Sequence, residues 1–278
     1  MASVLNTNMA SISAQRYLTN AQNKLAASFE KLSSGSRINR AQDDTAGMGI
    51  SQKLTASINS TSMAMRNAND AIGVLQTAEG ALAEVSTMLQ RFRELAVQGA
   101  NPALSSAQLG FLGTEMKGLQ TEIASVADRT KFNGTGLLNT SATLTFQTGE
   151  SISDTLAVDT VIITSFSAVN SLFTAVSALG ANLSTGDFTA ITDTIDTAIT
   201  EIATQRAKFG SQVNRLGHNI NNLSALYENL SAANSRVMDT DYASETASLT
   251  KTQILQQAAT AMLSQANSQP NVVLALLK

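Results

Sequence analysis

The chain has 278 residues, with 18 Lys or Arg against 21 Asp or Glu, and it contains 9 Phe, 3 Tyr, no Trp and no Cys. The absence of cysteine excludes disulfides, thiolate catalysis and thiolate metal sites, and the balanced charge gives no reason to expect a nucleic acid as partner. So few aromatic side chains favour a narrow helical bundle filled by Ala, Leu, Ile and Met over a thick core.

Neither end of the sequence predicts a membrane segment. The N-terminal residues lack the basic and continuous apolar stretches of a secretory signal peptide. The longest strongly apolar run, 272–277, is too short to span a bilayer. We therefore expect no membrane partner, and either an intracellular chain or one that is exported without a cleaved leader.

Leu18, Leu25 and Leu32 recur every seven residues and predict a first helix whose apolar stripe is too narrow to hold it alone. A connector over residues 34–46 follows, in which glycine can end the helix, asparagine tolerates a turn and aspartate can cap the next helix. Its arginines can form ion pairs with its aspartates, and a solvated loop and a subunit contact are equally good interpretations of each charge. The connector residues are Gly35, Arg37, Asn39, Arg40, Asp43 and Asp44.

Two further helices are expected before the middle of the chain. One runs over 45–98, and its apolar side consists of Leu54, Ile58, Met65, Ile72, Leu75, Leu82, Leu89 and Ala96. After Pro102 the next runs over 105–128, with Leu109, Leu112, Met116, Leu119, Ile123 and Val126 at steps of three and four.

The end of the helix over 45–98 carries the string QRFRELAVQ. Ala96 continues the core row and Phe92 lies beside it, which leaves Arg91, Glu94 and Leu95 toward the flank. An exposed leucine beside charges is a candidate for an interface, although single surface leucines are common.

The middle of the chain differs in composition. It has no Lys or Arg between Lys131 and Arg206, while it carries seven acidic residues. Alternating apolar residues over 143–160 predict a β-hairpin, and the apolar spacing over 169–179 predicts a short helix capped by Gly180. Its abundant Ser and Thr suggest O-linked glycosylation, with plain solubility as the alternative.

The C-terminal part contains two apolar rows at heptad spacing, which predict a long bundle helix whose second row is interrupted by Arg206. The rows are Ile195, Ile202, Phe209, Leu216, Leu223, Leu230 and Val237, and Ile199, Val213, Ile220 and Tyr227. A last helix is expected to stop at Pro270.

No pattern of residues predicts catalysis. His218, the only histidine, falls between two core positions and is expected in solvent. No nucleophile, zinc or phosphate-loop motif occurs, and the Asp43–Asp44 pair suits helix capping better than metal binding. We expect no enzyme activity, no metal and no cofactor.

Several strings together carry a family resemblance. They are KLSSGSRINRAQDDTAG (31–47), QRFRELAVQ (90–98), TKFNGTGLL (130–138), QRAKFGSQVNRL (205–216) and SRVMDTDYASETASLTKTQILQQAATAMLSQANSQP (235–270), followed by NVVLALLK. In their order, and at both ends of the chain, they closely resemble bacterial flagellin. The resemblance implies a mainly α fold, in which N- and C-terminal helices form an elongated coiled-coil bundle around a small middle segment with a β-hairpin.

The resemblance also implies five segments. Residues 1–40 would form an inner-tube helix and connector, 41–138 the N-terminal bundle helices, 139–190 a short variable outward-facing segment, 191–237 the C-terminal bundle helix, and 238–278 the C-terminal inner-tube helix.

The implied function is that of a structural subunit, a homopolymer that forms the flagellar filament for swimming. The chain would be secreted through type III export and located in the extracellular flagellum. Its implied partners are the export apparatus, a secretion chaperone, the filament cap and the hook-filament junction proteins. A hook-filament junction protein is the alternative, and a secreted enzyme or adhesin on a coiled-coil stalk is a third hypothesis that lacks a candidate site.

Flagellins of many bacteria are recognised by a host Toll-like receptor, and the matching positions here are Arg91, Leu95 and Glu115. The resemblance implies that the free chain activates this receptor and that the same face makes axial contacts in the filament. The tail leucines Leu274, Leu276 and Leu277 resemble the part that inflammasome receptors sense inside cells, with simple packing in the inner tube as the alternative.

Overall fold

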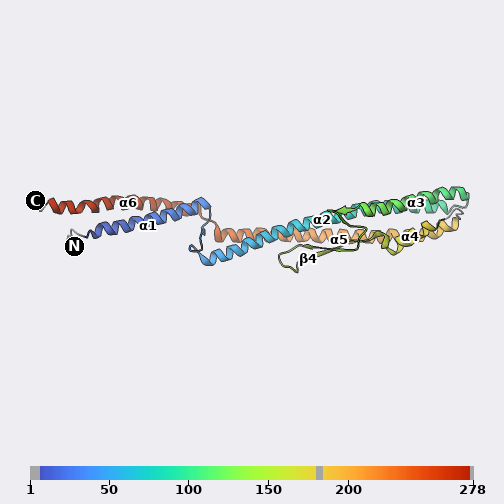
Figure 1. The fold of residues 1–278 in the computed structure, drawn as a ribbon, viewed down its shortest axis with the longest axis horizontal. Helices are drawn as coiled ribbons and strands as arrows, with labels where there is room; N and C mark the ends of the chain where they lie inside the picture. The colour runs from blue at the N-terminus through green and yellow to red at the C-terminus, as the bar shows by residue number, and fades with distance from the viewer. Residues whose placement is uncertain (1–6, 180–183, 276–278) are drawn as a thin grey trace. The chain divides into compact units, whose positions relative to one another are not determined.

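The computed structural model describes residues 7–179 and 184–275, of which 270–275 are described by their backbone alone (Figure 1). Its contacts divide the chain into two compact units. The first combines Met1–Ile58 with Glu228–Lys278, and the second is Asn59–Tyr227. The mainly α class and the small hairpin-containing middle segment are confirmed.

The first unit is built on a pair of helices from opposite ends of the sequence. Helix α1 (Met9–Ser34) lies alongside α6 (Tyr242–Ala275) in Figure 1. The Asn8 side chain donates to the Ala266 carbonyl at 2.7 Å, while the Tyr242 hydroxyl donates to the Leu32 carbonyl at 3.4 Å. Because the start of α1 lies beside the late part of α6, the two helices are antiparallel.

Capping residues set the boundaries of α1 and α2 (Thr45–Gly99). Gly35 ends α1 in the left-handed conformation, with φ at 71°, as its position in the connector predicted. The Asp44 carboxylate accepts the Gly47 N–H at 2.8 Å and so caps the first turn of α2. The predicted cap is therefore Asp44, whereas Asp43 binds the connector itself.

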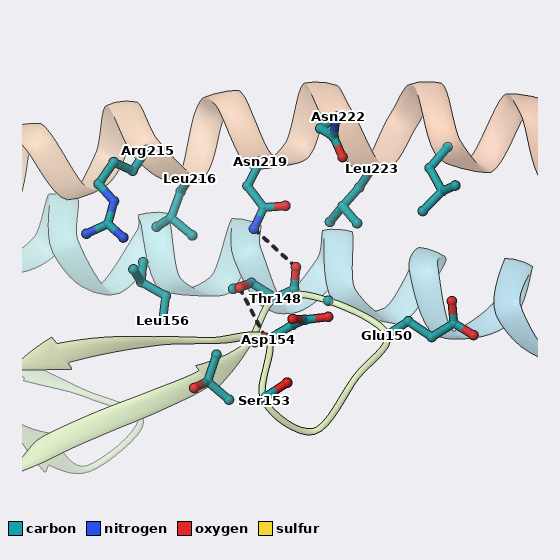
Figure 2. Close-up of a pocket in the computed structure, with 13 residues that line it drawn as sticks. Thr148, Glu150, Ser153, Asp154, Leu156, Arg215, Leu216, Asn219, Asn222 and Leu223 are labelled. Carbon is teal, nitrogen blue, oxygen red and sulfur yellow. Dashed lines mark hydrogen bonds between the residues drawn. The ribbon is translucent and has the colours of Figure 1, made fainter.

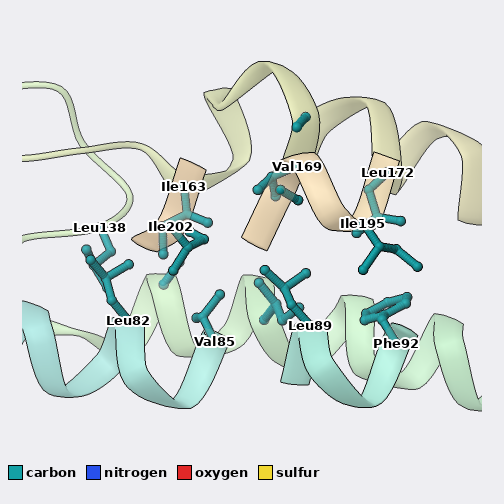
Figure 3. Packing of buried hydrophobic residues seen from close by; sticks show 14 of the residues in the cluster. Leu82, Val85, Leu89, Phe92, Leu138, Ile163, Val169, Leu172, Ile195 and Ile202 are labelled. Atoms are coloured by element: carbon teal, nitrogen blue, oxygen red, sulfur yellow. The ribbon is translucent and has the colours of Figure 1, made fainter. Parts of the chain in front are cut away.

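The second unit packs parts of α2 and α5 (Thr185–Met238) with α3 (Ser106–Arg129), α4 (Ser167–Ala178) and the short helix η1 (Ile163–Ser165). Figure 3 shows leucine, valine and phenylalanine side chains of α2 meeting isoleucines of α5 and side chains of α4 and η1. The largest fully buried side chains of this unit are Phe92, Phe188, Leu75, Leu82, Leu89, Leu95, Met116, Ile123, Leu137, Leu138 and Ile163.

Two antiparallel hairpins follow α3. Strands β3 (Thr143–Gln147) and β4 (Thr155–Asp159) form the predicted hairpin, with Phe146 opposite Leu156. Strands β1 (Lys131–Phe132) and β2 (Thr135–Gly136) form a smaller hairpin that the sequence analysis did not predict. Its turn, Asn133-Gly134, has positive φ at both residues, which is the strongest short-range signal for a hairpin.

The heptad rows of α5 are buried to different degrees. The first row is buried from Ile195 to Leu223, but Leu230 and Val237 are only half-buried. The second row lies at the edge of the core, and Tyr227 at its end is 40% exposed. Ile199, Val213 and Ile220 of the second row are half-buried and pack against the core, while His218 is exposed as expected.

The apolar side of α2 also changes along the helix. Leu54, Ile58 and Met65 are half-buried, and alanines such as Ala64 and Ala68 take the buried positions instead. The buried face of α2 therefore passes from small residues in the first part of the helix to large ones, such as Leu75 and Leu82, farther along.

The end of α6 differs from its prediction, because the helix continues through Pro270 to Ala275. A proline removes one helical hydrogen bond and crowds the preceding turn, yet the helix can resume beyond it.

Gly180, Leu276 and Leu277 lie outside the described residues, and the side chain of Leu274 is not described. Within 7–179 and 184–275, no helix is both long and apolar enough to cross a membrane.

Gly99 provides a test of the packing in the second unit. A Cβ at this position would lie 2.4 Å from the ring of Phe188, which is fully buried. We therefore expect Gly99→Ala to lower the free energy of unfolding by about 1 to 3 kcal/mol through overpacking. Urea unfolding followed by circular dichroism measures this change.

Gly80→Ala is the matched control, because a Cβ there would meet no atom within 4 Å. In the middle of α2 this substitution should stabilise the chain by about 0.5 to 1 kcal/mol through helix propensity. Equal effects of the two substitutions would contradict the packing of Phe188 on Gly99.

Candidate functional site

The described residues contain no cluster of side chains suited to bind a metal ion. No group of three or more His, Cys, Asp or Glu side chains in 7–179 and 184–275 is placed to hold a metal ion. A groove of about 590 Å³ lies between the loop of the β3–β4 hairpin and α5 (Figure 2). Its lining includes Asp154 and Arg215 but brings no nucleophile together with a base.

The polar side chains around this groove fasten the hairpin to the helices. Asn219 of α5 donates its amide to the Thr148 carbonyl at 3.1 Å, as Figure 2 shows. From α2, Asn67 donates to the Gln147 carbonyl at 3.0 Å. Both amides bind backbone carbonyls at the same end of the hairpin, and so they hold the hairpin against α5 and α2.

The α1–α6 pair has an unusual distribution of side-chain sizes. Its buried residues are small: Ala14, Ala21 and Ser28 from α1, and Thr252 and Ala266 from α6. The three from α1 recur every seven residues, which keeps them on the side that faces α6. Small residues allow two helices to approach closely, but they bury little apolar area.

Eight large apolar residues of the same pair are at least half exposed. We call them the terminal apolar surface, which consists of Met9, Ile12, Tyr17, Phe29, Tyr242, Ile254, Leu255 and Met262, all between 50% and 66% exposed. The predicted stripe of Leu18, Leu25 and Leu32 is half-buried between these two groups. Apolar residues of this size, spread along two adjacent helices, mark an interaction surface.

The connector is tied to the junction of α5 and α6 through its backbone. The Arg37 N–H donates to the Met238 carbonyl at 2.6 Å, and the Thr240 N–H donates to the Gly35 carbonyl at 3.0 Å. The Arg37 guanidinium adds a hydrogen bond to the Val237 carbonyl at 2.7 Å. A cation at the C-terminal end of α5 is also favoured by the helix dipole.

The predicted ion pairs within the connector were wrong. Arg40 pairs with Glu30 of α1 at 2.9 Å, and Arg37 binds carbonyls instead of an aspartate. The Asp43 carboxylate accepts the backbone N–H groups of Arg40 at 2.9 Å and of Asn39 at 3.1 Å. These hydrogen bonds, together with the nearby cations Lys31 and Arg40, lower the pKa of Asp43.

At the other candidate site, the structure brings two of the three predicted residues together. The Arg91 guanidinium binds Glu115 of α3 at 2.8 Å and Glu94 at 2.8 Å, and all three side chains are about half exposed. Hydrogen bonds from Arg91 to Glu94 and Glu115 raise the pKa of the guanidinium.

The third predicted residue, Leu95, is fully buried, so its expected place on the flank was wrong. Phe92, Leu95, Ala96 and Gly99 follow the spacing of a single helix face, and all four belong to the core side of α2. Leu95 therefore stabilises the second unit and is not part of its surface.

The sequence analysis missed two features of these surfaces. The pairing between residues 35–37 and 238–240 is made mainly by backbone groups, which leave no signal in the side chains. The small residues inside the α1–α6 pair did leave a signal, because Ala14, Ala21 and Ser28 are spaced by seven.

Comparison with known proteins gives matches along almost the whole chain. Residues 5–143 match the bacterial flagellin N-terminal helical region, and residues 192–277 match the bacterial flagellin C-terminal helical region. A flagellin of Halalkalibacterium halodurans is 41% identical over 276 residues, which cover 99% of this chain and 100% of the relative. A flagellin of Bacillus subtilis is 39% identical and covers 99% of both chains.

Two solved structures are similar as well. Bacillus cereus flagellin is 33% identical with a TM-score of 0.50, over 61% of this chain and 94% of that one. A putative flagellar hook-associated protein from Vibrio parahaemolyticus has a TM-score of 0.59 over 71% of this chain and 100% of that one. Because its identity is 15%, the second likeness concerns the fold alone.

The lowered pKa of Asp43 predicts how the connector responds to acid. A lowered pKa means that the carboxylate stabilises the fold above its ordinary pKa of about 4, and that this contribution is lost as the pH falls through the lowered value. Asp43→Asn should therefore be less stable than the wild type near neutral pH and equally stable in acid.

Thermal unfolding measured between about pH 7 and pH 2 tests this prediction. Asp70→Asn, at an exposed aspartate of α2, is the control. If the stability difference between Asp43→Asn and the wild type stays the same at every pH, the assignment to this carboxylate is wrong.

Proposed function

The chain belongs to the bacterial flagellin family, and on this premise we propose that its two terminal helices, α1 and α6, drive its assembly into the flagellar filament. The protein is a structural subunit of this helical polymer. The likeness to the hook-associated protein of Vibrio parahaemolyticus concerns the fold alone, so it does not favour a hook-filament junction protein.

The terminal apolar surface is the observation that carries this proposal. In the free subunit, α1 and α6 bury small residues against each other and leave large ones, such as Ile254 and Leu255, at least half exposed to water. Further copies of the chain can cover these residues, and burial of apolar area is the main favourable term in association. Contacts between unlike surfaces that repeat without closing give a filament.

The proposed burial of the terminal apolar surface also suggests where each segment inferred from the sequence lies in the filament. We propose an inner tube formed by 1–40 and 238–278, a surrounding bundle formed by 41–138 and 191–237, and an outward segment over 139–190. The pairing of α1 with α6 supports the first assignment. Secretion to the cell exterior, with the export apparatus, a chaperone, the filament cap and junction proteins as partners, belongs to the same proposal.

Truncation after Val237 tests the role of the C-terminal helix. The shortened chain lacks α6 and with it half of the terminal apolar surface, while the core of the second unit is retained. We expect a folded, soluble bundle that does not extend filament seeds. Light scattering and electron microscopy of seeded mixtures measure growth, and growth at the wild-type rate would refute the proposal.

A pair of substitutions separates apolar burial from charge in the same experiment. Leu255→Glu removes a large apolar side chain from the terminal apolar surface, and Gln257→Glu adds the same charge at a nearby exposed position of α6. Because Leu255 would be buried only in the filament, its loss should raise the monomer concentration needed for growth about tenfold or more. The Gln257→Glu variant should need a monomer concentration close to that of the wild type.

Recognition by a host Toll-like receptor is a second part of the proposal, and it rests on Arg91 and Glu115. Both side chains are about half exposed and joined by a charge-assisted hydrogen bond, so they offer a polar anchor to a partner. Arg91→Ala should weaken receptor activation by the free chain about tenfold or more in a reporter assay.

Arg93→Ala is the matched control for the receptor assay. Arg93 is similarly exposed but pairs with Asp196 of α5 at 2.6 Å. A wild-type free chain that leaves the receptor silent would contradict this part of the proposal, and so would equal losses in the two arginine variants.

A further inference from the structure

All oxidisable sulfur in the chain is held in thioethers, because there are 9 methionines and no cysteine. Met116 is fully buried in the second unit, whereas Met9 is 65% and Met262 66% exposed, both on the terminal apolar surface. Met63, on α2 in the second unit, is 47% exposed. The two most exposed of these methionines therefore lie on the surface that the proposed assembly would bury.

Met9 and Met262 lie near the same end of the α1–α6 pair. The Asn8 side chain donates to the Ala266 carbonyl at 2.7 Å, and the Ser11 hydroxyl donates to the Asn267 side chain at 2.7 Å. Met9 is between these two N-terminal residues in sequence, and Met262 is one turn before Ala266. A change at either sulfur therefore alters the same part of the terminal apolar surface.

We propose that Met9 and Met262 are modification sites at which a hydroperoxide controls whether a free subunit can join the filament, an inference that rests on the proposed function. The thioether sulfur attacks the terminal oxygen of the peroxide, the O–O bond breaks and an S–O bond forms. The sulfur is oxidised to a sulfoxide, and hydrogen peroxide is reduced to water.

A methionine sulfoxide opposes assembly because it is more polar than the thioether it replaces. A sulfoxide carries an oxygen that accepts hydrogen bonds, and its burial in an apolar contact without a donor is unfavourable. The terminal apolar surface offers mainly aliphatic and aromatic side chains, so a sulfoxide there opposes assembly. In the assembled filament the same sulfurs are covered by neighbouring copies, which makes the free subunit the sensitive form.

The test uses the full chain and hydrogen peroxide as the oxidant. Subunits are oxidised partially, mixed with filament seeds and separated into polymer and unassembled fractions, and the sulfoxide at each methionine is measured by peptide mass spectrometry. We expect the sulfoxides of Met9 and Met262 to be depleted about tenfold or more in the polymer. The sulfoxide of Met63 should be distributed evenly and serves as the internal control.

A double variant, Met9→Leu with Met262→Leu, tests the same sites independently. Leucine keeps the apolar character and approximate volume, so the variant should grow filaments and continue to do so after oxidation of its exposed methionines, whereas the wild type oxidised in the same way should not. Growth of a wild type that is fully oxidised at Met9 and Met262 would overturn the inference. An oxidised double variant that also fails to grow would overturn it too, because the sensitive sulfur would then lie elsewhere.

The outcome for the untreated chain separates this inference from the proposed function. If the untreated wild type extends seeds and oxidation has no effect, only the inference fails. If the untreated wild type does not extend seeds at all, the proposed function fails and the inference fails with it. Should the double variant not assemble before oxidation, the distribution of sulfoxides between the two wild-type fractions still decides the question.

Discussion

The close contact between α1 and α6 through small side chains is the constraint on which the first unit depends. Ala14, Ala21 and Ser28 allow the two helices to approach, but such residues contribute little hydrophobic stabilisation. Many large apolar residues of the pair, such as Ile254 and Met262, therefore stay more than half exposed in the subunit. The proposed assembly with other copies would bury them.

The second unit has a different basis for its stability. Its core contains large side chains such as Phe92, Phe188 and Leu89, and ion pairs between helices, such as Arg206 with Glu79, lie at half-exposed positions. Half-exposed pairs contribute little by themselves, so the core carries the stability of this unit. One chain thus combines a unit with a core of large side chains and a unit that leaves much of its apolar surface exposed.

Much of this architecture could be predicted from the sequence. Helices over 45–98 and 105–128 and the hairpin over 143–160 were predicted almost to the residue, because capping residues and apolar periodicity act locally. The prediction for Leu95 was wrong because it assigned only the row through Ala96 to the core. Leu95 follows Phe92 by three residues, so the helical period places it on the same buried face.

Other features could not be predicted from local patterns. Arg40 reaches back to Glu30 on the preceding helix, and Arg37 reaches carbonyls two hundred residues later in the chain. Such partners depend on how the chain is folded in space, and many acceptors for a guanidinium are equally plausible in the sequence. The passage of α6 through Pro270 likewise depends on how well the surrounding turns continue the helix.

The docking of the β3–β4 hairpin has a consequence for how the protein can vary. Asn67 and Asn219 bind the carbonyls of Gln147 and Thr148, so at this end of the hairpin the helices recognise the main chain and not particular side chains. Residues 149–153, which form the tip of the loop, are exposed apart from the half-buried Gly149. Gly149 itself has no room for a Cβ, which would lie 2.4 Å from Asp154. Beyond it, a change at 150–153 leaves both anchoring carbonyls in place, so we expect this part of the tip to accept an inserted peptide without loss of the docked hairpin.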